Sequence, residues 1–124
     1  MTIDKVAEVL NGKVLFKEKG EARNVGHIVA NDLMSDVLLV DKDDILLLTS
    51  LASDQTMRTA QIIGAMGVVV HNNKPLPASM CEVAKTLGIS LATVPHAKYE
   101  SCVLLHAALE AEKNAAEKNA AKEG

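Results

Sequence analysis

Short apolar runs alternate with polar turns along the chain and predict a series of strands and helices. Apolar residues at helical spacing, preceded by capping residues such as Thr2 and Ser53, indicate helices, whereas continuous aliphatic stretches indicate strands. The predicted strands cover residues 13–16, 24–29, 45–49, 68–70 and 89–94. The predicted helices cover residues 3–10, a short segment within 31–38, residues 54–66, residues 77–87 and a last stretch from residue 97; Gly67 is expected to end the third of them.

The order of these elements predicts the fold class. From residue 44 onward the pattern runs strand, helix, strand, helix, strand, helix, and the strands at 45–49 and 68–70 are apolar throughout. Strands without a polar face are typical of a parallel sheet that helices cover on both sides. We therefore predict a three-layer α/β/α domain with a mostly parallel sheet.

The last helix changes character along its length. Its first turns are expected to bury Tyr99, Cys102 and Val103, with His106 as a further candidate. Beyond Leu109 no large apolar residue follows, and Glu-Lys-Asn-Ala-Ala occurs twice in tandem. Such a segment favours a helix but has no side to bury. We predict an α/β domain over residues 1–110 and a solvated helical tail over residues 111–124 that frays toward its end.

Composition and sequence pattern limit the binding partners and the cellular location that we expect. The 124 residues carry a net charge of -3 and only 2% aromatic residues, so neither a basic surface for phosphates nor stacking platforms for bases are expected. We predict no nucleic-acid partner. No apolar run approaches the roughly 20 residues that cross a bilayer, and the first residues lack the features of a secretory signal, which predicts no membrane span and a cytoplasmic protein. The two cysteines, Cys81 and Cys102, are expected to be reduced thiols in or near the core.

Candidate chemistry lies in the loops that follow the strands. In open α/β sheets ligands bind outside the carboxyl ends of the strands, where helix N-termini offer free backbone N–H groups. The ligand-binding candidates in these loops are Asp32, Ser35, Asp36, Ser50, Ser53, Asp54, Thr56, His71, Asn72 and His96. Hydroxyl groups beside a helix start suit a phosphate or a carboxylate, although the same residues commonly serve only as helix caps. Asp54 would repel an anion unless it contacts a ribose hydroxyl or a metal.

Metal and catalytic motifs are weakly represented. Cys102 and His106 share a helix face but supply only two ligands, fewer than a zinc site needs, so we predict no metal. His27, His71 and His96 fall near strand ends, and a pocket shared by them is a further hypothesis. The GxxxxGK[ST], GxGxxG, GxSxG and HExxH motifs are absent. We therefore expect neither an enzyme nor a cofactor.

Several segments together resemble the DRTGG domain. They are the stretch from Gly26 to Leu38, the strand at 45–49, the helix from Asp54 and the spacing to residues 67–70, and the resemblance runs from about Val6 to Leu109. It is greatest for the short DRTGG proteins encoded near iron-only hydrogenase genes, and more distant for the N-terminal domain of HPr kinase/phosphorylase, a regulatory domain of phosphotransacetylase and an insert beside CBS domains in some pyrophosphatases. Where the family has Asp-Arg-Thr and Gly-Gly, this chain has Asp54-Gln55-Thr56 and His71-Asn72-Asn73. Asp32, Ser35 and Asp36 are the matched positions.

The resemblance implies a non-catalytic regulatory or scaffold module that self-associates, with a hydrogenase-related setting. Our leading hypothesis is a homodimer or larger homo-oligomer that senses a small metabolite, such as a nucleotide, at the strand ends. Two alternatives stay open: a protein-interaction adaptor without a ligand, and a small transferase or hydrolase that uses Asp54 or His71 as acid or base.

Overall fold

The computed structural model describes the chain from Met1 to Glu123, and its side chains as far as Ala120. Five strands form one sheet in the order β1-β5-β4-β3-β2. The strands are β1 (Lys13–Phe16), β2 (His27–Ala30), β3 (Ile45–Thr49), β4 (Gly67–Val70) and β5 (Ser90–Thr93). The helices are α1 (Ile3–Val9), α2 (Met34–Val37), α3 (Asp54–Ile62), α4 (Ala78–Leu87) and α5 (Lys98–Glu123).

The sheet is parallel except at one edge. β2, β3, β4 and β5 run parallel to their neighbours, and β1 pairs antiparallel with β5. The pairing of β1 is irregular between Val14 and Phe16. Because β2 to β5 share one direction, all their carboxyl ends lie at the same edge of the sheet, the place where the sequence predicts ligand-binding loops.

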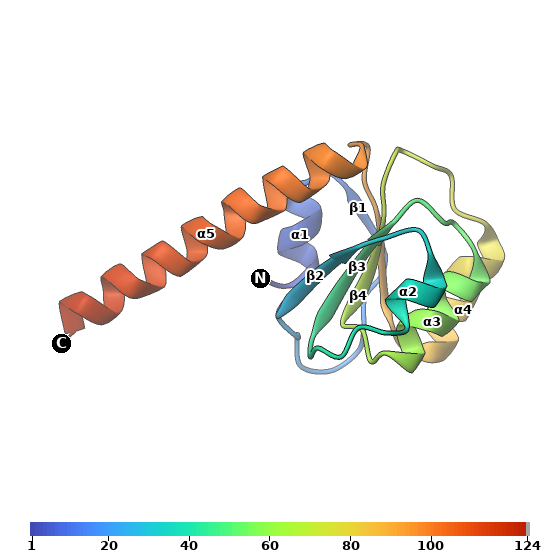
Figure 1. Ribbon diagram of the computed structural model, residues 1–124, viewed down its shortest axis with the longest axis horizontal. Helices are drawn as coiled ribbons and strands as arrows, with labels where there is room; N and C mark the ends of the chain where they lie inside the picture. The colour runs from blue at the N-terminus through green and yellow to red at the C-terminus, as the bar shows by residue number, and fades with distance from the viewer. Residues whose placement is uncertain (124) are drawn as a thin grey trace.

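Helices cover both faces of the sheet, so the predicted three-layer α/β/α architecture is confirmed (Figure 1). α1 and α5 lie on one side of the strands, and α2, α3 and α4 lie on the other. Side chains alternate along each strand: in β3, Leu46 and Leu48 belong to the apolar cluster beneath α1 and α5, whereas Ile45 and Leu47 belong to the cluster beneath α2, α3 and α4. All five β3 residues are buried, as expected for a strand covered on both faces.

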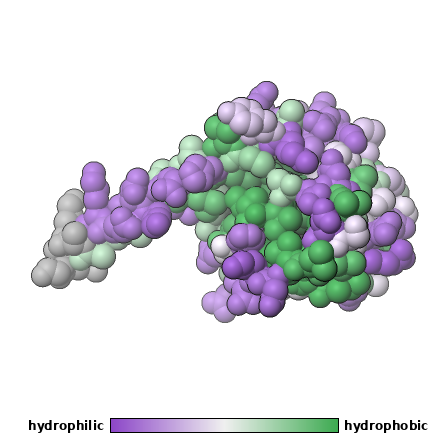
Figure 2. All heavy atoms as spheres, viewed as in Figure 1, coloured by the Kyte–Doolittle hydropathy of each residue, from purple (hydrophilic) through white to green (hydrophobic). Residues whose placement is uncertain are grey.

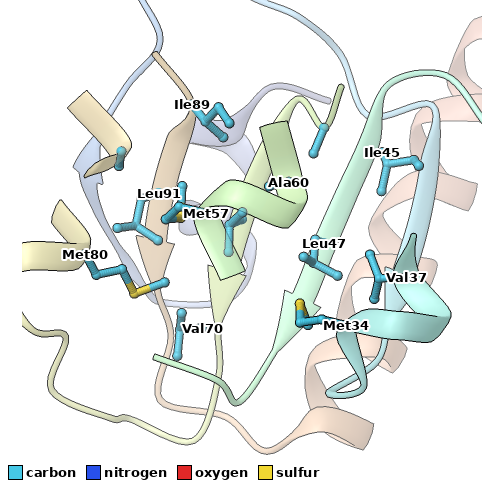
Figure 3. Close-up of a cluster of buried hydrophobic side chains, with 13 residues drawn as sticks. Met34, Val37, Ile45, Leu47, Met57, Ala60, Val70, Met80, Ile89 and Leu91 are labelled. Atoms are coloured by element: carbon cyan, nitrogen blue, oxygen red, sulfur yellow. The ribbon is translucent and has the colours of Figure 1, made fainter. Parts of the chain in front are cut away.

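The larger cluster fills the space between the sheet and the α2–α4 layer (Figure 3). Met57 and Ala60 from α3 and Met80 from α4 point toward Leu47 and Leu91 of the sheet. Small residues on α3 let its backbone approach the strands closely. This packing holds the start of α3 beside the end of β3.

Local signals set most helix ends. The Thr2 and Ser53 side chains accept hydrogen bonds from Lys5 N and Thr56 N and cap α1 and α3, as predicted. Gly88 ends α4 in the left-handed conformation, with φ 70°. The predicted end of the third helix is wrong: α3 stops at Ile62 rather than near residue 66, because Gly64 takes φ 67° and leaves the helical region two residues later. Gly67 instead begins β4.

Two further expectations need correction. β2 begins at His27, three residues later than predicted, because residues 24–26 belong to the preceding loop. The predicted inner face of the last helix is also wrong, since Tyr99 is 78% exposed and Val103 is 47% exposed. Among the α5 side chains that the structure describes, Ser101 and Leu105 are fully buried, and Cys102 is half-buried beside them.

The helix α5 extends away from the body of the molecule (Figure 1). Residues 111–120 are all exposed, in agreement with a helix that has no side to bury. The N-terminal amine lies 3.4 Å from Glu112 Oε2, so contact with the body reaches at least that residue. A division between residues 110 and 111 stays a prediction, and the expected fraying at Gly124 falls outside the described residues. No helix in the described part of the chain is long and apolar enough to cross a bilayer.

Candidate functional site

Four loops meet at the carboxyl edge of the sheet. β2 leads to Asp32, β3 leads to Ser50, β4 leads to His71, and β5 leads to His96. Backbone hydrogen bonds tie the loops together: His71 N donates to Thr49 O over 3.1 Å, and Asn72 N donates to His96 O over 2.8 Å. The fold therefore brings together segments that are far apart in sequence.

Asp32 is the most strongly bound carboxylate of this edge. Its Oδ1 atom accepts hydrogen bonds from the Thr49 hydroxyl over 2.9 Å and from Ser50 N over 2.6 Å. Lys98 Nζ lies 3.9 Å from Oδ2. Burial raises the pKa of Asp32, but the hydrogen bonds from Ser50 and Thr49 and the charge of Lys98 together outweigh burial and lower it to about 2. Asp32 is thus a carboxylate at neutral pH, and Oδ2 is its outward oxygen.

The turn between β3 and α3 forms the middle of the edge. Ser53 caps α3, and the Thr56 hydroxyl donates to Leu51 O over 2.9 Å, which fixes the turn from within. Asp54 and Gln55 occupy the first turn of α3, where backbone N–H groups have no helical partner. No hydrogen bond from either N–H group is present among the described residues. Ser53 and Thr56 therefore act as caps, and the free N–H groups beside them are the donors available to a ligand.

His71 is the most unusual residue of the edge. It is only 2% exposed, and among the described residues neither ring nitrogen has a hydrogen-bond partner. Its backbone continues the ladder of β4, in which Val69 faces α1 and α5 and Val70 faces the opposite layer. This alternation places the His71 ring on the side of α1 and α5. A buried ring is poorly placed to exchange protons with a substrate.

Two lysines join this edge that sequence reasoning missed. Lys74 Nζ donates to Ser50 O over 2.9 Å, and Lys98 faces Asp32. The loop that carries Lys74 turns sharply, with Asn72 and Asn73 at φ 71° and 53°. A lysine in a polar loop gives no sequence signal of its position, because only the folded loop brings its amine to the end of another strand.

Other predicted residues lie apart from this arrangement. Ser35 and Asp36 are exposed on α2. His27 is exposed at the start of β2, the opposite end of a strand from the carboxyl edge, so the hypothesis of a pocket shared by His27, His71 and His96 is wrong within one chain. The His96 Nδ1 atom lies 3.3 Å from Glu100 Oε2. Among the described residues no group of three or more His, Cys, Asp or Glu side chains could hold a metal.

A small cavity lies where the parallel strands begin, opposite the carboxyl edge of the sheet. It encloses about 100 Å³ between the start of α1, the loop after β1 and the starts of β4 and β5. Arg23 lines it and is fully engaged, with bonds to Asp44 Oδ1 over 2.9 Å and to Gly64 O over 3.1 Å. Arg23 thus fastens the loop before β2 to the body.

The arrangement defines a class: a three-layer α/β domain with polar loops gathered where its parallel strands end.

No family model matches the chain, and no curated protein matches it. Among solved structures, it is similar to the CBS and DRTGG domains of the regulatory region of Clostridium perfringens pyrophosphatase, complexed with the activator diadenosine tetraphosphate. The TM-score is 0.69 at 13% identity, and the match covers 83% of this chain and 45% of that one. The chain thus spans less than half the length of this neighbour. At this identity the likeness shows the fold, and it supports the DRTGG resemblance at that level.

Proposed function

We propose that this protein is a non-catalytic regulatory domain that binds a nucleotide at the carboxyl edge of its sheet and self-associates. The observation that carries the proposal is the arrangement around Ser50: Asp32 binds Ser50 N, Lys74 binds Ser50 O, and Lys98 faces Asp32. The free N–H groups at the start of α3 follow four residues after Ser50. The structural neighbour supports it, because that regulatory region was solved with a nucleotide activator.

Each group suits a different part of a nucleotide. The N–H groups of Asp54 and Gln55 and the positive end of the helix dipole favour a phosphate. Lys74 and Lys98 are exposed enough to turn toward the same phosphate. The Oδ2 atom of Asp32 can accept a hydrogen bond from a ribose hydroxyl. Asp54 repels phosphate unless it too accepts a hydroxyl, which favours a ligand with a sugar over inorganic phosphate.

Self-association rests on exposed apolar surface. The large apolar side chains that are more than a third exposed are Leu33, Leu38, Leu39, Leu51, Ile62, Tyr99, Val103 and Leu104. Leu33, Leu38 and Leu39 come from one short segment around α2, and exposed apolar patches mark interaction sites on soluble proteins. A hydrogenase-related setting and a cytoplasmic location stay predictions that the resemblance and the sequence supply.

The enzyme alternative depends on Asp54 or His71. The burial of both His71 nitrogens disfavours a role in proton transfer, while Asp54 is half-buried at the helix start. Asp54→Asn and His71→Ala variants separate the hypotheses. A regulatory domain changes its ligand affinity in the Asp54→Asn variant, whereas a transferase or hydrolase loses turnover in the variant of its acid or base.

A thermal-shift titration with ATP, GTP, diadenosine tetraphosphate and inorganic phosphate tests the binding proposal. Ligand at 100 times its dissociation constant stabilises the fold by about 2.7 kcal/mol, which raises Tm by about 10 °C in a domain of this size. A Lys98→Ala variant should weaken binding at least fivefold, and Lys85→Ala, which removes an exposed lysine on α4, is the matched control. If no nucleotide raises Tm, the proposal of a nucleotide ligand is overturned, and the protein-interaction adaptor without a ligand remains.

A further inference from the structure

The cavity where the parallel strands begin has no part in the proposed nucleotide site. It holds about 100 Å³ between the start of α1, the loop of residues 17–26 and the starts of β4 and β5. Figure 1 shows this loop crossing the lower end of the sheet, and Figure 2 shows hydrophilic side chains gathered there. An engineered protein cavity of about 150 Å³ holds benzene. A space of this size therefore suits a ligand of about five or six non-hydrogen atoms.

The inner wall of the cavity combines apolar surface with one polar group. Ile3 and Met66 line it, and both are buried in the apolar cluster beneath α1. Ser90, the first residue of β5, is only 2% exposed. Its hydroxyl oxygen accepts a hydrogen bond from Glu18 N over 2.9 Å, and among the described residues no acceptor for its proton is present. A buried donor without an acceptor costs free energy, so this wall favours a ligand that supplies an oxygen atom.

Charged side chains form the outer rim of the cavity. Arg23 is bound to Asp44 and to Gly64 O, so its guanidinium group is not free to bind a ligand. Glu18 Oε2 lies 4.0 Å from Arg23 Nη1, which is too far for a hydrogen bond. The Glu18 side chain is only 34% exposed. Glu18 therefore presents a carboxylate that can accept a hydrogen bond from a cationic group.

Lys17 adds a cation at the same rim. Its Nζ atom lies 3.0 Å from Asp4 Oδ2, and both side chains are more than half exposed. Exposed ion pairs contribute little to stability, so Lys17 can exchange Asp4 for a ligand carboxylate at low cost. The cavity thus has two donors for a carboxylate, Lys17 and the Ser90 hydroxyl, and one acceptor for an ammonium group, Glu18.

We propose that this cavity is a second ligand site, which binds a small zwitterionic amino acid of the size of glycine or alanine. The ligand carboxylate accepts hydrogen bonds from Ser90 and Lys17, and its ammonium group donates to Glu18. Its short side chain lies against Ile3 and Met66, and larger amino acids exceed the volume of the cavity. The site lies at the opposite end of the strands from the proposed nucleotide site and does not depend on it.

Amide NMR spectra of the chain test the ligand class. L-alanine and glycine should shift the amide signals of Glu18 and Ser90 but not that of Asn72, with a dissociation constant on the order of 0.1 mM, as expected for so few atoms. Propionate and ethylamine carry only one of the two charges and should bind at least tenfold more weakly, as should the larger L-leucine. If any of these three binds as tightly as L-alanine, the assigned class is wrong. If neither amino acid shifts these signals at about 10 mM, the site itself is overturned.

Substitutions test the contacts. Glu18→Gln keeps the size of the side chain and removes its charge, so the dissociation constant for L-alanine should rise at least fivefold. Glu82→Gln on α4 is the matched control, because its carboxylate is exposed and lies outside the cavity, and it should leave the affinity within twofold of wild type. Ser90→Ala removes the free donor and should also weaken binding at least fivefold. If Ser90→Ala does not fold, the glutamate pair decides: equal affinity in Glu18→Gln and Glu82→Gln would overturn the proposal.

Discussion

Replacement of Asp32 by asparagine tests the electrostatics of the candidate site. The amide keeps an oxygen acceptor for Thr49 and Ser50 but loses the charge that strengthens both hydrogen bonds. A pKa lowered from 3.8 to about 2 corresponds to about 2.4 kcal/mol for a group shielded from solvent. The side chain is 41% exposed, so solvent screening reduces the expected loss to about 1 kcal/mol, or about 4 °C in Tm.

The free energy that Asp32 contributes to folding should depend on pH in a defined direction. The pKa of Asp32 is lower in the folded than in the unfolded chain, so its contribution is present above pH 4 and is lost as pH falls from 3.8 toward 2. Urea unfolding of wild type and Asp32→Asn at several pH values between 7 and 2.5 measures the difference. Asp36→Asn on exposed α2 is the control and should change stability by less than about 0.5 kcal/mol. If the difference in free energy of unfolding between wild type and Asp32→Asn does not shrink in acid, the electrostatic role assigned to Asp32 is wrong.

Three further substitutions test the packing by urea unfolding. Leu47→Ala, in the centre of the sheet, should cost about 3 kcal/mol, whereas Leu39→Ala at an 82% exposed position should cost less than about 0.5 kcal/mol; equal losses would contradict the assigned core. Gly88→Ala should cost about 1–2 kcal/mol because of φ 70°, and a neutral result would exclude the left-handed helix end. His71→Met should raise stability by about 1 kcal/mol, because it removes two buried nitrogens without partners; a clear loss would show that the ring has a partner.

Much of the architecture was accessible from local sequence signals. β3 is apolar at every position but Thr49, and that pattern alone indicates a strand covered on both faces. Caps such as Ser53 and the glycine at position 88 mark helix ends because their chemistry acts on neighbouring backbone groups. Gly64 and Gly67 could each end α3. The sequence does not distinguish them, because the choice depends on where β4 has to begin.

The buried face of α5 was not accessible in the same way. Tyr99 and Val103 form an apolar stripe, yet Ser101 and Leu105 face the sheet. Periodicity measures only which residues share a side of a helix. The rotation of α5 about its axis follows from its contact with α1 and from the position of Lys98 beside Asp32.

For the candidate site, local sequence signals indicate which loops carry polar groups, because each of those loops follows an apolar strand. Which of these groups meet depends on the folded chain. In the fold, Asp32 binds Ser50, and Lys74 and Lys98 join them, whereas the His71 ring is buried and His27 lies at the far end of its strand. Caps and apolar runs act between residues close in sequence, so they can be read along the chain. Contacts between loops depend on strand order and helix rotation, which the whole chain sets together.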